Sequence, residues 1–417
     1  MLTLSNSKQQ RLIYICFIMY TSVYLAKLNY NALIIEILAD LGGTKSAAGL
    51  VGSFFFFSYG IGQVVNGFSA KYMNEKYVMT VSLLGSSLCN IAMAFAPSVG
   101  VMKYIWLING MVLSTLWCNV VKVQGKYISS ENLPKALMVM GFTTPVGTAV
   151  NYGLCALVSR LTSWRVQFWI AGALMGFMAV LWFATLSDTE RCAGSKIIPD
   201  EETENKEIGV KLPGKKITIG VIVCLAAMFL TGMCTQFTRE GLNSWVPSIL
   251  HEIYKMSSTQ SIALTLFIPL LSSLSSFILI LLERKCKDFL VLSMIFSSAA
   301  AIFMAVLVGC YSLNSVVITF VCFIAVSMGS TGIASITTNH IPLYYRDRFD
   351  PGMMAGVGQG FCYIGSTLSI YTLGYVADNG GWFNVFLMLA VVVSASVVMC
   401  VVAKLITRER HTAPKNT

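Results

Sequence analysis

Long apolar stretches separated by short polar connections make up most of this 417-residue chain. An apolar run of about 20 residues is long enough to cross the hydrocarbon core of a bilayer as a helix. Twelve such runs are present, at residues 12–38, 47–70, 77–97, 102–123, 136–159, 165–186, 218–246, 258–282, 289–309, 313–337, 354–376 and 382–405. The alternating pattern of an outer-membrane barrel, with strands of about 10 residues, does not fit. The pattern therefore predicts an all-α membrane protein with twelve transmembrane helices.

One long polar stretch divides the twelve segments into two sets of six. It covers residues 187–217 and is rich in charged residues and proline, which is typical of a flexible linker. We expect an N-terminal six-helix bundle at 1–186, a cytoplasmic linker at 187–217, and a C-terminal six-helix bundle with a short cytoplasmic tail at 218–417. The other connections are short, so we do not expect a separate enzymatic domain.

Composition and charge support this class. The chain is 56% hydrophobic and 12% charged, with a net charge of +10. If the N-terminus is cytoplasmic, most of the 29 lysines and arginines lie in inner loops and tails. This asymmetry follows the positive-inside rule, places both termini in the cytoplasm, and removes nucleic-acid binding as an explanation of the charge. The outer loops hold Lys45, Lys103, Arg160, Arg165 and Lys255.

The 12 cysteines are scattered singly, without Cys-x-x-Cys pairs or histidine clusters at metal spacing. We therefore expect neither a metal nor another cofactor. We expect a monomer in the cell membrane, most simply the cytoplasmic membrane of a bacterium, with the lipid bilayer and a small anion as its partners.

Two cations occupy matching places in the first and seventh apolar segments. When the segments are superposed, Lys27 aligns with Arg239 and Asn31 aligns with Asn243. A charge at bilayer depth costs at least about 2.5–3.5 kcal/mol, so it persists where it faces a polar cavity, a partner or a ligand. The pair predicts one anionic ligand between two halves. A structural role for Arg239 stays open, although Glu240 is expected to be a poor direct partner because sequence neighbours point about 100° apart on a helix.

The sequence around these cations resembles a known family. Six plus six segments around a charged linker resemble the major facilitator superfamily. Tyr24-Leu-Ala-Lys27-Leu-Asn29-Tyr30 resembles the Tyr-Leu-x-Arg-Lys-Asn-Phe motif of its organophosphate:phosphate antiporters, which include bacterial glycerol-phosphate and hexose-phosphate transporters. Arg239-Glu-Gly241-Leu-Asn-Ser-Trp245-Val-Pro247 resembles their Arg-x-Gly-x-x-x-Trp-x-Pro. Less specific glycine patterns include Gly147, Gly360 and Gly365, which we expect to let helices approach closely.

The resemblance implies roles for individual residues. Lys27 and Arg239 would bind the substrate phosphate, with Tyr20, Tyr24 and Tyr363 beside it. Thr144 and Gln63 are also expected to line the substrate site. Both depart from the glycerol-phosphate branch, because Thr144 replaces a histidine and Gln63 replaces a lysine. Lys27 also replaces an arginine, and a lysine lacks the bidentate fork that arginine offers to phosphate. The resemblance therefore implies an anion site more firmly than a phosphate site.

Carboxylates are scarce in the predicted spans, where Glu36 and Glu240 are the candidates. Proton-driven transporters commonly use buried carboxylates. Their scarcity favours exchange of one anion for another, with inorganic phosphate as the counter-substrate and Glu240 as the candidate coupling residue. The leading hypothesis is a secondary transporter that moves a phosphate ester or related acid by alternating access. The alternatives are a proton- or sodium-coupled symporter of a carboxylate such as a sugar acid, and a sugar-phosphate sensor that does not transport.

Overall fold

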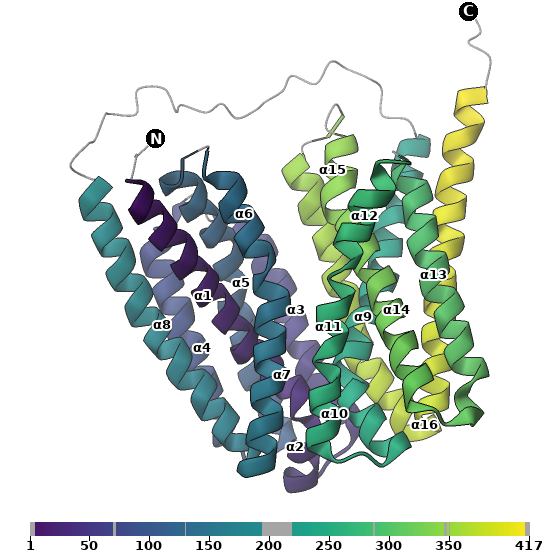
Figure 1. Ribbon diagram of the computed structural model, residues 1–417, viewed down its shortest axis with the longest axis horizontal. Coiled ribbons are helices and arrows are strands. Elements are labelled where there is room, and N and C mark those ends of the chain that lie inside the picture. Colours follow the sequence, from purple (N-terminus) through teal and green to yellow (C-terminus); the bar gives the residue numbers. More distant parts are fainter. Residues whose placement is uncertain are drawn as a thin grey trace, which may run out of the picture. The chain divides into compact units, whose positions relative to one another are not determined.

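The computed structural model describes residues 5–69, 72–129, 131–193, 219–286, 288–345, 348–349 and 351–412. Within these ranges every regular element is a helix (Figure 1). The all-α class predicted from the sequence is therefore confirmed. Most of the predicted linker, residues 194–217, and the last five residues of the tail lie outside the described residues.

The N-terminal part begins with a long helix that is interrupted near its end. Helix α1 ends at Ala32, and Leu33 (φ −106°, ψ 11°) separates it from α2. The helices of this part are α1 (Asn6–Ala32), α2 (Ile34–Leu41), α3 (Lys45–Ser69), α4 (Glu75–Ala94), α5 (Val99–Tyr127), α6 (Leu133–Gly141), α7 (Thr143–Leu161) and α8 (Trp164–Ala193). The predicted span 136–159 falls on α6 and α7, which meet at Phe142.

The C-terminal part begins with α9, a continuous helix of 36 residues. Its helices are α9 (Ile219–Tyr254), α10 (Ser258–Thr265), α11 (Phe267–Ser272), α12 (Ser275–Glu283), α13 (Phe289–Gly309), the 3-10 turn η3 (Tyr311–Leu313), α14 (Val316–Ser335), the π-helix η4 (Ile336–His340), α15 (Ile341–Tyr344) and α16 (Pro351–Thr412). Helix α16 contains two predicted spans, and the chain turns between them at Gly381 (φ 71°, ψ 178°), a conformation that glycine adopts without steric cost.

Ten stretches within the described residues are long and apolar enough to cross a membrane, judged by length and composition. One of them joins α10 to α12, and one holds both halves of α16. The described residues of each of the twelve predicted spans are mostly helical. Hydrophobic run length therefore predicted the helices well and their interruptions poorly.

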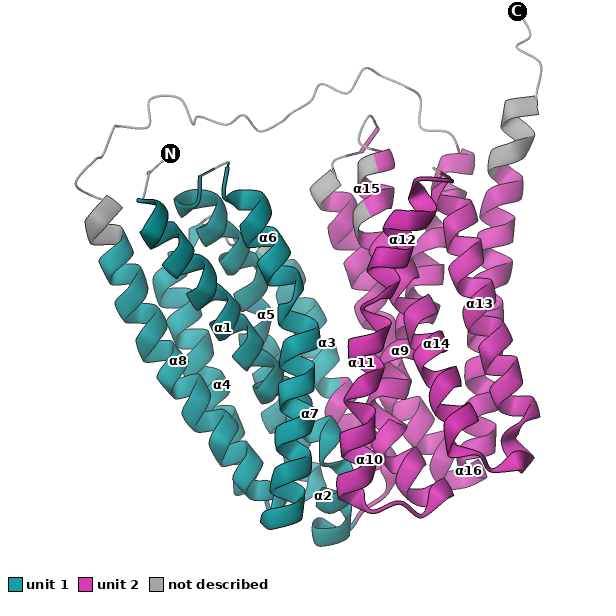
Figure 2. Cartoon of the chain, viewed as in Figure 1, with its two compact units in different colours: residues 1–42, 54–210 teal, residues 43–53, 211–417 magenta. Residues whose placement is uncertain are grey.

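The helices form two compact units (Figure 2). Unit 1 contains residues 1–42 and 54–210, and unit 2 contains residues 43–53 and 211–417. In unit 1, α1 packs against α5, α7 and α8, while α4 packs against α5 and α8. In unit 2, α9 lies along α16, and α13 packs against α14 and α16.

The first residues of α3 are bound to α16 inside unit 2. Asp378 accepts hydrogen bonds from the backbone N–H of Lys45 (3.0 Å) and of Ser46 (2.7 Å). These N–H groups have no acceptor within their own helix, so the carboxylate satisfies them and complements the helix dipole. A Cβ atom at Gly49 would lie 2.5 Å from the carbonyl oxygen of Ile370, so the contact requires glycine there.

Candidate anion-binding residues

Lys27 lies on α1 with its ammonium group between two aromatic rings. The Nζ atom is 5.1 Å from the ring centroid of Tyr24 and 5.1 Å from that of Tyr59 on α3. Both distances are within the range of a cation–π interaction, which stabilises a cation without cancelling its charge. Lys27 is partly buried and Tyr59 is buried. Tyr59 was not predicted as a site residue, because it lies on α3 and reaches Lys27 of α1 only through helix packing.

Tyr24 connects α1 to α7. Its hydroxyl lies 2.7 Å from Oγ1 of Thr144, so the structure brings these two predicted residues together. The approach of the helices depends on Gly147, since a Cβ atom there would lie 2.8 Å from Cβ of Tyr24 and 2.9 Å from the carbonyl oxygen of Thr21. Gly147 therefore lets α7 contact the turn of α1 that precedes Lys27.

Tyr20 and Gln63 lie on the same two helices as Tyr24 and Tyr59. The ring of Tyr20 is 6.0 Å from that of Tyr24 and 5.1 Å from that of Trp117 on α5. Gln63 follows Tyr59 by one helical turn on α3 and therefore lies on the same face of that helix. Unit 1 thus gathers Lys27, Tyr20, Tyr24 and Thr144, as predicted, and adds Tyr59 and Trp117, which the sequence analysis did not select.

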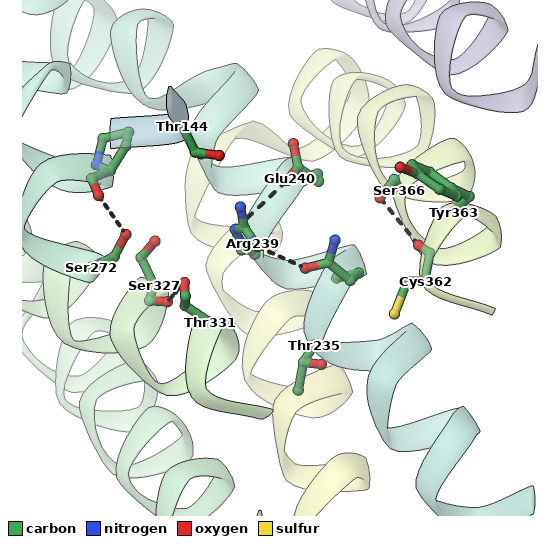
Figure 3. A network of polar contacts seen from close by, with 12 residues as sticks. Thr144, Thr235, Arg239, Glu240, Ser272, Ser327, Thr331, Cys362, Tyr363 and Ser366 are labelled. Atoms are coloured by element: carbon green, nitrogen blue, oxygen red, sulfur yellow. Dashed lines mark hydrogen bonds and ion pairs between the residues drawn. The ribbon is translucent and has the colours of Figure 1, made fainter. Parts of the chain in front are cut away.

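Arg239 lies on α9 and has polar partners on its own helix. Its Nη1 donates to Oε1 of Gln236 at 3.3 Å, and its Nε lies 3.7 Å from Oε1 of Glu240 (Figure 3). The expectation that Glu240 is a poor partner was wrong. The two long side chains bend toward each other, which compensates for the 100° between their Cβ directions. The separation exceeds that of a hydrogen bond, so the pair is an ion pair without a close N–H···O contact.

The other predicted residue of unit 2 lies on the helix beside α9. Tyr363 belongs to α16, where Gln359 Nε2 donates to its hydroxyl at 3.5 Å. Figure 3 shows Tyr363 and Arg239 on neighbouring helices. A Cβ atom at Gly365 would lie 2.2 Å from the carbonyl oxygen of Met233, so α16 and α9 touch through their backbones one and a half turns before Arg239. Gly360, in contrast, has nothing within 4 Å of its Cβ position, and the close-packing role expected for it is not observed.

A family model describes most of this sequence. The model of the Major Facilitator Superfamily matches residues 16–349. The chain belongs to the Major Facilitator Superfamily. The resemblance inferred from the span motifs is thereby confirmed, and the chain is a multi-pass membrane protein of this superfamily.

Relatives of this superfamily member cover nearly its whole length. A "probable hexose phosphate transport protein" of Chlamydia trachomatis is 22% identical over 411 residues, which is 91% of this chain and 88% of the relative. The "membrane sensor protein UhpC" of Escherichia coli is 22% identical over 415 residues, with coverages of 91% and 88%. Among solved structures, a bacterial homologue of the human lysosomal transporter Spinster has a TM-score of 0.76 at 12% identity, over 97% of this chain and 98% of that one. This last likeness concerns the fold alone.

Proposed function

We propose that this superfamily member transports a small phosphate ester, of the sugar-phosphate class, across the cytoplasmic membrane of a bacterium by alternating access. Lys27 and Arg239 bind the anionic group. The observation that carries the proposal is the retention of both cations in long apolar helices, within a chain related over 91% of its length to a probable hexose phosphate transport protein.

The surroundings of Lys27 suit reversible binding of an anion. The rings of Tyr24 and Tyr59 present negative faces to the ammonium group but carry no full charge. The two rings therefore leave the charge of the ammonium group uncancelled. The hydroxyl pair of Tyr24 and Thr144 adds hydrogen-bonding groups beside it. An anionic oxygen bound to Lys27 would form a charge-assisted hydrogen bond with the partly buried ammonium group.

The guanidinium group of Arg239 is held by two contacts on its own helix. Glu240 lies near Nε, and Gln236 accepts from Nη1. A guanidinium group has five N–H donors, so donors remain for two parallel hydrogen bonds to a phosphate. A bound phosphate also competes with Glu240 for the same positive charge. Substrate binding is therefore expected to weaken the Arg239–Glu240 ion pair.

We propose exchange against inorganic phosphate as the mode of transport. Lys27 and Arg239 place positive charge in membrane-spanning helices, and a carrier that reorients without substrate lacks the negative charge that the substrate brings, so this reorientation is unfavourable. A bound anion removes this obstacle in either direction. Coupling of this kind requires that the ligand interacts differently with the states of the carrier.

One observation favours a second candidate, proton-coupled symport. The carboxylate of Glu240 is 14% exposed and pairs with the residue that binds the substrate. If the substrate displaces Glu240, the released carboxylate is able to take up a proton. Glu240→Gln separates the two modes, because exchange survives the substitution, whereas uphill uptake driven by a pH gradient is lost.

The substrate class is testable on the purified protein. A ligand that binds only the folded state raises the apparent melting temperature. We expect phosphate esters and inorganic phosphate to do so, and sugar acids and dicarboxylates to have no effect. Stabilisation by sugar acids alone would contradict the assignment. The sensor alternative, suggested by the likeness to UhpC, predicts the same binding without any movement of substrate across a vesicle membrane.

A further inference from the structure

Three asparagines from three helices meet inside unit 1, beside the turn of α1 that carries Lys27. Asn29 on α1, Asn90 on α4 and Asn109 on α5 all have 0% exposure. Ser86 on α4 is equally buried. Amide side chains are uncommon in membrane-spanning cores, because each donor or acceptor without a partner costs free energy there.

These side chains satisfy one another and converge on a single carbonyl group. Nδ2 of Asn90 (3.2 Å) and Nδ2 of Asn109 (3.0 Å) both donate to the carbonyl oxygen of Ala26. Nδ2 of Asn29 donates to Oδ1 of Asn90 at 2.9 Å. Ser86 completes the set, because its hydroxyl donates to Oδ1 of Asn109 at 2.8 Å and its carbonyl accepts from Nδ2 of Asn90 at 2.9 Å.

The network forms hydrogen bonds with the turn of α1 that carries Lys27. Ala26 immediately precedes Lys27, and Asn29 follows it by two positions. Asn29 also uses its Oδ1 to accept from the backbone N–H of Tyr30 at 2.9 Å. Less than two turns beyond Lys27 the helix stops at Leu33. The hydrogen bonds to the Ala26 carbonyl and from Asn29 therefore join α1 to α4 and α5 just before α1 is interrupted.

Two other buried amides of the same unit, Gln167 and Asn119, do not behave in this way. Both amide atoms of Gln167 and one amide atom of Asn119 have no hydrogen-bond partner among the described residues. Asn119 is 1% exposed and donates only to the carbonyl of Thr115 on its own helix, α5. The complete satisfaction of the Asn29–Asn90–Asn109 set therefore distinguishes it from buried amides that bond locally.

We infer that Asn90 and Asn109 are positioning residues that fix the Lys27 turn of α1 and so hold the ammonium group between Tyr24 and Tyr59. The effect of the network on anion binding rests on the proposed function, in which Lys27 binds the anion. An apolar side chain would fill the same space but would leave the Ala26 carbonyl without its cross-helix donors.

The test compares Asn109→Leu with the matched control Asn119→Leu. Both replace a buried asparagine of α5 by a side chain of similar size, and Asn109→Ala with Asn119→Ala provides a second pair in case leucine prevents folding. The first readout is amide hydrogen exchange of peptides covering residues 24–33 of the substrate-free protein. We expect exchange there to rise about two- to tenfold in the Asn109 variants, the range that one net hydrogen bond contributes. The Asn119 variants should leave it unchanged, and equal exchange in both would overturn the inference.

The second readout is a double-mutant cycle for binding of glucose phosphate. If Asn109 acts through Lys27, Asn109→Leu weakens binding in the wild-type background and has no further effect in a Lys27→Ala background. Equal losses in the two backgrounds would show that Asn109 acts elsewhere and would overturn the inference. A wild-type protein that binds no phosphate ester would contradict the proposed function instead, and the exchange readout would still decide whether the asparagines hold this turn.

Discussion

At the scale of residues, the two cations differ in chemistry as well as in surroundings. Lys27 offers a point charge between two tyrosine rings, and Arg239 offers a planar fork beside Glu240 and Gln236.

Arg239→Lys should weaken phosphate-ester binding nearly as much as Arg239→Ala, because an ammonium group does not reproduce the fork. Lys27→Arg should be tolerated or should improve binding, since guanidinium also stacks on aromatic rings. Titration of each variant with glucose phosphate and with a sugar acid checks this. Loss of phosphate-ester binding in Lys27→Arg would favour a carboxylate substrate.

The ring of Tyr59 supports the cation from the second side. Tyr59→Leu should reduce anion affinity about two- to thirtyfold, the range expected for a cation–π contact of about 0.5–2 kcal/mol. Tyr59→Phe keeps the ring face and is the matched control, with near-normal affinity expected. Isothermal titration of both variants makes the comparison. Equal losses in the two would mean that the hydroxyl group, and not the ring, matters at this position.

Motif position selected Lys27, Tyr20, Tyr24 and Thr144, which the structure brings together in unit 1. It did so because the motif of the resembled family assigns a role to each of these positions, and a motif is visible in a sequence. Tyr59 and the asparagine network were not selected, because their contacts join separate helices and depend on packing. The Arg239–Glu240 ion pair was judged wrongly, since helix geometry fixes Cβ directions but not the ends of long side chains.

At the scale of elements, the start of α3 depends on a carboxylate from another helix. Asp378 of α16 satisfies the N–H groups of Lys45 and Ser46, and Lys45 forms an ion pair with Glu252 of α9 at 3.1 Å. Asp378→Ala should destabilise the protein by about 0.5–2 kcal/mol, as loss of an N-cap side chain does. Thermal unfolding of the purified protein measures this.

Asn379→Ala is the control for that substitution. Asn379 is the neighbouring residue, is equally exposed, and donates only to Tyr375 on its own helix at 2.8 Å. Its replacement should leave the melting temperature unchanged. If Asp378→Ala is also neutral, water replaces the carboxylate at the start of α3 without loss, and the contact does not hold this helix to α16.

The helices were predictable where the length of an apolar run alone determines that a segment is helical. The apolar runs of the sequence predicted the helices, because a spanning segment must satisfy its backbone hydrogen bonds internally. The interruptions at Leu33 and Phe142 were not predicted, since neither residue is a characteristic helix breaker. Gly147 and Gly365 behave as expected of small residues at helix contacts, whereas Gly360 shows that a motif glycine is not always such a contact.

At the scale of the whole molecule, the basic residues predict which side of the membrane each connection faces. The termini and the 187–217 stretch should be cytoplasmic, because this side holds most lysines and arginines. In intact cells, Asn205→Cys should resist an impermeant thiol reagent, and Ser312→Cys, in the turn between α13 and α14, should react, both in a background without other reactive cysteines. Labelling of Asn205→Cys from outside would contradict the topology.

The sequence could not show how segments are shared between the compact units. Residues 43–53 lie within the predicted N-terminal bundle, yet they group with unit 2 through contacts such as Gly49 with Ile370. Such contacts depend on shape rather than on hydropathy. The predicted boundaries at residues 186 and 217 remain predictions, although α8 continues as helix to Ala193.

The central claim is that Lys27 and Arg239 bind an anion that the protein moves. Uptake of radiolabelled glucose phosphate into phosphate-loaded proteoliposomes tests it most directly, with wild type, Arg239→Ala and Lys27→Ala reconstituted at equal amounts of folded protein. We expect rapid wild-type uptake that needs internal phosphate and persists with a protonophore. Arg239→Ala should have no measurable uptake and Lys27→Ala almost none, because removing one partner of a desolvated charge pair typically costs about 2–5 kcal/mol. Near-normal uptake by folded Arg239→Ala would contradict the account.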